Sequence, residues 1–276
     1  MPAAARSAGP PRRKRFGQHF LHDRRVAARI VRALDARPGD HLVEIGPGRR
    51  ALTGPLLELP GCTLDAIEID RDLAAGLRPA FAGAPGHTLH EADALAFDFS
   101  ALARARGGRL RILGNLPYNI STPLLFHLLS HTDAIIDLTL MLQREVVARL
   151  AAAPGDGDYG RLGVMLAPRV QVQRLFDVGP GAFQPAPRVW SAVVRLSVRA
   201  QPLFPISPQF AAVVAAAFSQ RRKTLRNALS QMLTSGQIVA CGIDPGARPG
   251  TLAAEAFNTL AEAAARATLD RAGGEG

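Results

Sequence analysis

Short apolar runs alternate with amphipathic or loop-forming stretches along the first half of the chain. This alternation constrains the fold more than any other feature. The apolar runs suit buried strands and are too short for core helices. Strands separated by helices predict an α/β domain, a parallel sheet with helices on both faces. The expected strands are 41–45, 64–69, 88–91, 110–113 and 134–142, and the expected helices are 23–34, 52–59, 71–78 and 122–129.

Two further strands are expected at 170–176 and 192–198, after a helix around 160–167. The stretch between them is rich in Pro and Gly and predicts no crossover helix, so these strands should pair antiparallel. A parallel sheet that ends in an antiparallel strand pair is typical of methyltransferases, whereas a purely parallel sheet suits a dehydrogenase better. We therefore expect a Rossmann-like class I S-adenosylmethionine methyltransferase domain.

Proline residues mark a linker at 201–208, and the pattern beyond it is helical. Helices are expected at 210–233 and 252–269, because apolar residues from Phe210 to Phe218 follow helical spacing. The sequence thus predicts a disordered arm at 1–11, a methyltransferase domain at 12–204 and a small all-helical C-terminal domain at 205–276.

Positive charge exceeds negative charge, with 33 Lys and Arg against 23 Asp and Glu, a net charge of +10. Such a surplus favours an anionic partner such as nucleic acid, although a GC-rich genome is an alternative explanation for heavy arginine use. No apolar stretch suits a membrane span or a secretory signal. Cys62 and Cys241 match no metal or disulfide spacing, which fits a reducing, cytoplasmic compartment.

A glycine-containing turn follows the first strand of the alternating series. Gly46 and Gly48 let the backbone turn sharply and let a ligand approach closely. Glu68 ends the next strand, about twenty residues on, where an acid accepts hydrogen bonds from ribose hydroxyls. This geometry serves NAD and S-adenosylmethionine alike. Asp93 ends the third strand, where it either contacts an adenine amino group or simply forms a turn. For Gly46 and Gly48 the alternative is a tight strand-to-helix turn that binds no ligand.

Asn115, Leu116, Pro117 and Tyr118 follow the fourth strand, at the sheet edge where ligands bind in α/β folds. Adenine N6 is a poor nucleophile because its lone pair is delocalised into the ring. The Asn115 amide oxygen and the Leu116 carbonyl could each accept an N6–H hydrogen bond, turning that lone pair toward a methyl donor. Pro117 holds Leu116 extended, and Tyr118 offers a face for a base extruded from its stack. A buried turn is the structural alternative.

The sequence resembles the KsgA-type ribosomal RNA adenine dimethyltransferases, which act on two adjacent adenines near the end of the 16S RNA of the small subunit. The motifs that carry the resemblance are 14–21, 44–48, 114–123, 181–191 and 218–227. It implies S-adenosylmethionine as cofactor, with contacts from His19, Leu21, Gly46, Glu68, Asp93 and Asn115. It implies catalysis by Asn115, Leu116 and Tyr118, with Phe183 closing over the other face of the adenine.

The resemblance also implies that the C-terminal helical domain grips the small ribosomal subunit, with the protein expected to be a cytoplasmic monomer. Arg221, Arg222, Lys223 and Arg226 are expected on one helix, where they contact RNA phosphates or form a solvated face. Arg12 to Arg15 invites the same two interpretations. His87, His90 and Glu91 would point to both faces of one strand, so we expect no metal site.

Arg49 and Arg50 depart from the family, which tends to have small or apolar residues there. We expect both side chains to point outward, away from the cofactor. Three other functions stay open at this point: a large-subunit RNA methyltransferase of the antibiotic-resistance kind, an RNA-binding assembly factor with dispensable methylation, and an NAD-dependent dehydrogenase.

Overall fold

The computed structural model describes residues 19–273. The arm expected to be disordered at 1–11 and the basic run at 12–15 lie outside the described residues.

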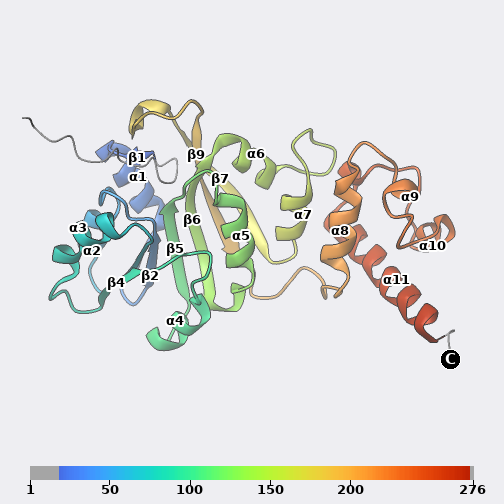
Figure 1. Ribbon diagram of the computed structural model, residues 1–276, viewed down its shortest axis with the longest axis horizontal. Coiled ribbons are helices and arrows are strands. Elements are labelled where there is room, and N and C mark those ends of the chain that lie inside the picture. The colour runs from blue at the N-terminus through green and yellow to red at the C-terminus, as the bar shows by residue number, and fades with distance from the viewer. Residues whose placement is uncertain (1–18, 274–276) are drawn as a thin grey trace, which may run out of the picture.

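A seven-stranded sheet forms the centre of the larger lobe, in the order β4-β3-β2-β5-β6-β9-β7 (Figure 1). The first five of these strands run parallel, and β9 pairs antiparallel with both β6 and β7. The predicted fold class is therefore confirmed. The strands are β2 (His41–Ile45), β3 (Thr63–Glu68), β4 (His87–Glu91), β5 (Leu110–Asn115), β6 (Ile135–Gln143), β7 (Val170–Val178) and β9 (Ser191–Val198).

Helices cover both faces of the sheet. One face packs on α1 (Arg24–Leu34), α2 (Thr53–Leu57) and α3 (Arg71–Phe81), and the other on α4 (Phe99–Arg106), α5 (Ser121–Leu129), α6 (Arg144–Ala151) and part of α7 (Arg161–Leu166). The sequence did not predict α4 or α6. The first is a short helix that ends in alternating alanine and arginine, and the second follows a long apolar strand without a break.

A second, two-stranded sheet joins β1 (Phe20–Leu21) to β8 (Phe183–Gln184). The two strands are only two residues long, so no alternation of polar and apolar residues could reveal them. Their pairing holds the start of the described chain against the loop between β7 and β9.

The C-terminal lobe is built from α8 (Phe210–Ser219), α9 (Leu225–Ala228), α10 (Ser235–Ala240) and α11 (Ala254–Gly273). The prediction of one helix over 210–233 was wrong, because the chain turns at 220–224. After the turn, the N–H groups of Leu225 and Arg226 donate to the carbonyls of Ala247 and Pro245 instead of continuing α8. This turn buries Leu225 completely in the lobe's core.

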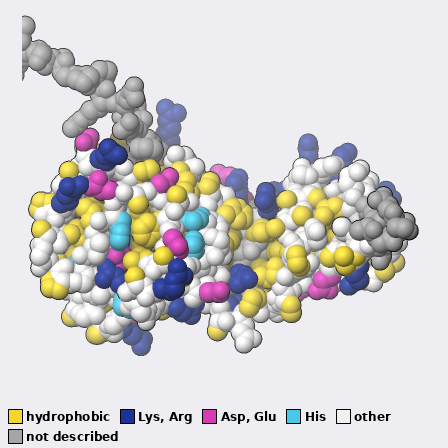
Figure 2. Space-filling view, turned by 60° about the horizontal axis from the view of Figure 1, so that its bottom comes forward, with side chains coloured by type: hydrophobic (Ala, Val, Ile, Leu, Met, Phe, Trp, Pro, Cys, Tyr) yellow, Lys and Arg dark blue, Asp and Glu magenta, His cyan; other side chains and the backbone are white. Residues whose placement is uncertain are grey.

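The core of this lobe also includes two residues that precede the linker. Tyr159 and Val164 pack with Phe210, Leu225 and Phe257, and the Tyr159 hydroxyl donates to the Leu252 carbonyl over 2.8 Å. The space-filling view shows the molecule narrowing between the two lobes (Figure 2). The predicted domain limits stay a prediction. No helix within the described residues has the length and apolar character needed to cross a membrane.

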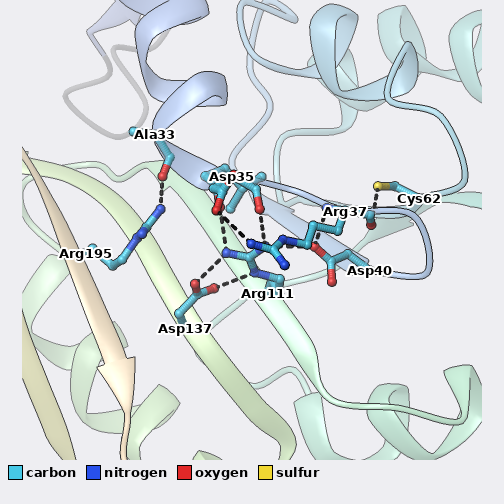
Figure 3. A network of polar contacts seen from close by, with 9 residues as sticks. Ala33, Asp35, Arg37, Asp40, Cys62, Arg111, Asp137 and Arg195 are labelled. Atoms are coloured by element: carbon cyan, nitrogen blue, oxygen red, sulfur yellow. Dashed lines mark hydrogen bonds and ion pairs between the residues drawn. The ribbon is translucent and has the colours of Figure 1, made fainter.

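A buried arginine ties α1 to the sheet (Figure 3). Arg111 on β5 lies opposite Asp137 on β6 and binds its two carboxylate oxygens over 3.0 and 2.7 Å. Its other N–H groups donate to Asp40 and to the carbonyls of Leu34 and Asp35, where α1 ends. A guanidinium has five N–H donors, so the five bonds satisfy the group fully. Burial would lower the pKa of Arg111, but the bonds to Asp137 and Asp40 raise it above its ordinary value.

We predict that Arg111→Leu lowers the free energy of unfolding by about 3–5 kcal/mol, because it leaves the buried Asp137 carboxylate without its partner. The measurement is equilibrium urea unfolding followed by circular dichroism. Arg149→Leu is the matched control: it removes an exposed arginine paired with Glu145 and should cost less than about 1 kcal/mol. Equal losses in the two variants would contradict the prediction.

Glu44 lies on β2 with its side chain in the interior, and its Oε2 has no hydrogen-bond partner among the described residues. Burial raises the pKa of Glu44 to about 8, and repulsion from Glu68 adds to the shift. The folded protein therefore keeps a proton on Glu44 across a range where the unfolded chain has lost it. Stability linked to Glu44 is full below pH 4.5 and decreases as the pH rises toward 8.

We predict that Glu44→Gln removes this pH dependence, because glutamine imitates the protonated acid and has no proton to lose. Between pH 5 and 8 the free energy of unfolding of the unaltered protein should fall relative to the variant by up to about 4 kcal/mol. Thermal unfolding at several pH values measures the difference. Glu145→Gln, at an exposed position on α6, is the control and should leave the profile unchanged. Parallel profiles for Glu44→Gln and the unaltered protein would show that Glu44 is ionised in the fold.

Candidate active site

A cavity of about 250 Å³ lies at the carboxyl ends of the parallel strands. The structure brings most of the predicted site residues to its wall, although they come from separate parts of the chain. These are His19, Gly46, Gly48, Glu68, Asp93, Asn115, Leu116, Pro117 and Tyr118. Their convergence follows from the parallel sheet, which places successive strand ends at one edge.

The glycine turn bends the chain over one side of this cavity. Gly46 and Gly48 have φ values of +68° and +54°, a conformation that L-residues rarely adopt. A Cβ on Gly48 would lie 3.1 Å from the Phe20 ring, so a side chain there would displace the ring that lines the cavity. Glycine is thus needed at position 48 for both backbone conformation and space.

Glu68 is held between the glycine turn and the end of β3. Its Oε2 accepts from the Gly48 N–H over 3.1 Å and its Oε1 from the Asp70 N–H over 3.0 Å. Burial raises the pKa of Glu68, against the opposing effect of these two bonds. The carboxylate is therefore fixed in place at the cavity wall, with lone pairs left to accept hydrogen bonds from hydroxyl groups of a ligand.

Of the two roles that the sequence left open for Asp93, the structure has the turn, and the contact with an adenine amino group stays a prediction. The Asp93 Oδ1 accepts from the Leu95 N–H over 2.9 Å, which makes a turn, and the residue is exposed at the cavity wall. Apolar walls flank the two acids: Ile45, Ile67, Ile69 and Leu95 line the same cavity. Sequence reasoning did not single out these apolar residues, although each stands next to or near a predicted site residue in the chain.

The orientation of the Asn115 amide is set by one hydrogen bond. Its Nδ2 donates to the His19 carbonyl over 3.0 Å, so its Oδ1 is the end left free. Neither this oxygen nor the Leu116 carbonyl accepts a hydrogen bond from any residue between 19 and 273. The Leu116 N–H donates to the Met141 carbonyl on β6 over 3.2 Å, which anchors the loop to the sheet. Two hydrogen-bond acceptors thus stand unused, on consecutive residues, at the cavity.

Tyr118 is fixed at both ends of its ring. Its hydroxyl lies 2.7 Å from the Oγ of the fully buried Ser191, and its ring centroid lies 5.6 Å from that of His19. Burial raises the pKa of Tyr118, although the bond to Ser191 opposes the shift. The phenol is therefore protonated at physiological pH, so it does not supply a phenolate base. Ser191 ends the motif at 181–191, and no sequence signal marks it as the partner of Tyr118.

Two predicted residues do not reach the cavity wall. Leu21 and Phe183 pair across β1 and β8, and both side chains are buried, with exposed fractions of 5% and 3%. Arg49 and Arg50 are exposed and do not line the cavity; the Arg49 guanidinium lies 4.5 Å from the centroid of the Phe20 ring, on top of it. The outward orientation expected for the two arginines is what the structure has.

The predicted RNA-binding residues lie in the C-terminal lobe and do not share one helix. The expectation of one shared helix was wrong, because 221–223 lie in the turn before α9 and only Arg226 is helical. Arg221 donates to the carbonyls of Gly157 and Tyr159, so its guanidinium holds the turn to the loop before α7. Arg222, Lys223 and Arg226 are exposed.

Within residues 19–273, no three His, Cys, Asp or Glu side chains gather where they could hold a metal ion. His90 belongs to the trio His87, His90 and Glu91, for which the sequence predicts no metal site. It lies 2.8 Å from the Asp65 carboxylate, and Arg106 binds the same carboxylate through two nitrogens. Burial would raise the pKa of Asp65, but His90 and Arg106 hold it below its ordinary value.

Comparison with known proteins agrees with this geometry. Residues 11–266 match the family model described as ribosomal RNA adenine dimethylase. "Ribosomal RNA small subunit methyltransferase A" of Methylococcus capsulatus is 56% identical over 86% of this chain and 91% of its own. The protein of the same name from Pseudomonas aeruginosa is 53% identical over 90% of this chain and 93% of its own.

Two solved structures share the fold. The 23S rRNA methyltransferase ErmE superposes with a TM-score of 0.68 and 27% identity, over 89% of this chain and 99% of its own. A dimethyladenosine transferase from Plasmodium falciparum gives a TM-score of 0.72 at 24% identity, over 88% of this chain and 96% of its own. The family match spans nearly the whole chain and includes the glycine turn, the acids and the Asn-Leu-Pro-Tyr loop, so the chain belongs to the ribosomal RNA adenine dimethylase family, whose methyltransferases use S-adenosylmethionine.

Proposed function

We propose that the protein transfers methyl groups from S-adenosylmethionine to N6 of two adjacent adenines near the 3′ end of small-subunit 16S ribosomal RNA, as a cytoplasmic monomer acting during ribosome biogenesis. The observation that carries the proposal is the pair of unused acceptors, Asn115 Oδ1 and the Leu116 carbonyl, beside the cavity at the strand ends.

The residues at the cavity fit S-adenosylmethionine. Gly46 and Gly48 leave room for its close approach, Glu68 presents a fixed carboxylate for the ribose hydroxyls, and the flanking isoleucines suit an adenine ring. Asp93 stands where it would accept from the adenine amino group, and His19 and Asn115 complete the wall. When bound, this cofactor supplies an electrophilic methyl group.

The chain's own contribution is to orient the target nitrogen. Asn115 Oδ1 and the Leu116 carbonyl would each accept one N6–H of the adenine, which localises the nitrogen lone pair and aims it at the methyl donor. The bond from Asn115 Nδ2 to the His19 carbonyl keeps the amide from flipping, so the acceptor always faces the cavity. The Tyr118 ring, held by the bond to Ser191, would support one face of the target adenine. Phe183 would cover the other face of the adenine once its side chain turns out of the core.

We predict that Asn115→Ala lowers kcat by about 10²–10³-fold at saturating cofactor, the usual cost of removing one preorganised hydrogen-bonding group from a transition state. The measurement is transfer of labelled methyl groups to unmethylated small subunits. Gln171→Ala, which removes an exposed amide on β7, is the control and should retain full activity. A kcat near that of the unaltered protein would assign Asn115 a structural role only.

The deciding experiment incubates the protein with labelled S-adenosylmethionine and either unmethylated small subunits or large subunits. Label on adenine of small-subunit RNA is expected. Label confined to the large subunit would favour the function of ErmE, which shares the fold. No label with either subunit would leave only an assembly role. Arg49 and Arg50 gave that hypothesis some support, because side chains in the cofactor site would weaken methylation, but both lie outside the cavity. Membership of the ribosomal RNA adenine dimethylase family excludes the dehydrogenase alternative.

The exposed basic residues of the C-terminal lobe are proposed to bind RNA. Substituting Arg222, Lys223 and Arg226 together with glutamine should reduce the slope of log affinity against log salt concentration by about 0.7–0.9 for each phosphate that is no longer neutralised. Arg221→Gln should instead lower the melting temperature, because it removes the bonds to the Gly157 and Tyr159 carbonyls. Salt-dependent binding of small subunits measures the first effect; an unchanged slope in the triple variant would refute the proposed role of these residues.

A further inference from the structure

A small polar cavity of about 220 Å³ lies at the edge of the sheet opposite the active site. Three arginines line it, each next to the end of a strand: Arg109 precedes β5, Arg169 precedes β7 and Arg199 follows β9. β5 runs from this edge to Asn115, so its length places the cavity roughly 20 Å from the loop of Asn115 to Tyr118, the catalytic loop of the proposed function. The arginines therefore have no part in the chemistry proposed above.

The arginines of this cavity outnumber its acids, so its net charge is positive. None of the three guanidinium groups forms an ion pair with a described carboxylate, although the buried Arg111 has two such partners. Among the described residues, the only acid at the wall is Asp133, which is exposed to solvent. Concentrated, unpaired guanidinium groups raise the local affinity for an anion.

One donor in the cluster is left unsatisfied. Arg199 Nε is buried and has no hydrogen-bond partner among the described residues. Arg109 donates to the Ile135 carbonyl, and Arg169 makes only a long bond of 3.3 Å to Thr132 Oγ1. A buried donor without an acceptor costs free energy, and each guanidinium has more N–H groups than these bonds use. The cluster thus has free donors as well as free charge.

A second cavity, of about 400 Å³, shares Arg169 with the first. Its wall is mainly apolar, with Phe126, Leu129, Met165, Ile206 and Phe210. A phosphate in the arginine cavity would have an apolar surface next to it for the attached nucleoside, which a free inorganic ion would not use.

We propose that the cavity formed by Arg109, Arg169 and Arg199 binds a backbone phosphate of the RNA substrate. The inference rests on the proposed function, because it takes the RNA as the source of the phosphate. Guanidinium groups bind phosphate oxygens by paired N–H donors, and they do so without reading the base. The phosphate would orient the RNA on the narrow part of the molecule while the catalytic loop holds the target base at the opposite edge.

The test compares Arg199→Gln, Arg109→Gln and the control Arg149→Gln, which removes an equal charge from an arginine already paired with Glu145. Small-subunit affinity is measured at several salt concentrations. Each cavity variant should weaken binding about tenfold and lower the salt slope by about 0.7–0.9. The control should do neither, and all variants should keep the unaltered calorimetric affinity for S-adenosylmethionine.

Two further measurements separate the possible failures. Arg109 is exposed, so Arg109→Gln folds even if Arg199→Gln does not, and melting temperatures identify a folding defect. Addition of inorganic sulfate should shift the Nε–Hε signal of Arg199 in a nitrogen–proton correlation spectrum. A sulfate response combined with unchanged subunit affinity in both variants would assign the cavity to free anions and overturn the RNA-binding role.

Unchanged affinity and slope with no sulfate response would overturn the site altogether, while methylation by the unaltered protein would still support the proposed function. Conversely, if the unaltered protein methylates neither subunit, the proposed function fails, and weaker subunit binding by Arg109→Gln and Arg199→Gln would still support the phosphate site.

Discussion

The bidentate pair between Arg111 and Asp137 is the interaction on which the arrangement of the larger lobe depends. It joins β5 to β6 and, through Asp40 and the last carbonyls of α1, fixes the helix that covers this part of the sheet. Since a buried guanidinium is tolerated only when its donors are satisfied, α1 has one position on the sheet. β5 then extends to its other end, where Asn115 begins the Asn-Leu-Pro-Tyr loop at the cavity.

The predicted site residues differ in where their side chains are held. Glu68, Tyr118 and the Leu116 amide are each held by hydrogen bonds to the framework, so the groups that would face the cofactor and the base need no ordering when ligands arrive. Leu21 and Phe183 are instead buried against each other's strands. The proposed closure by Phe183 would have to disturb this small sheet, which has only two residues in each strand.

Much of this structure could be predicted from the sequence, because apolar runs and helix periods report burial directly. The strands of the parallel sheet, the antiparallel pair and the cavity residues at the strand ends followed from that pattern. Other features depend on long-range contacts. The Phe210 to Leu233 prediction failed because carbonyls of Pro245 and Ala247 take over the N–H groups of Arg226 and Leu225. The Tyr118–Ser191 bond and the arginine cavity join residues that no local pattern connects.

The position of Tyr159 has a consequence for how the chain comes apart. This residue and Val164 complete the core of the C-terminal lobe, although both precede the proline-rich linker. Cleavage of the linker would therefore not release two independent folding units: the downstream fragment would lack part of its own interior, and the upstream fragment would expose an aromatic side chain. The two fragments should stay associated after proteolysis, and a C-terminal fragment made alone should need the 159–164 segment to fold.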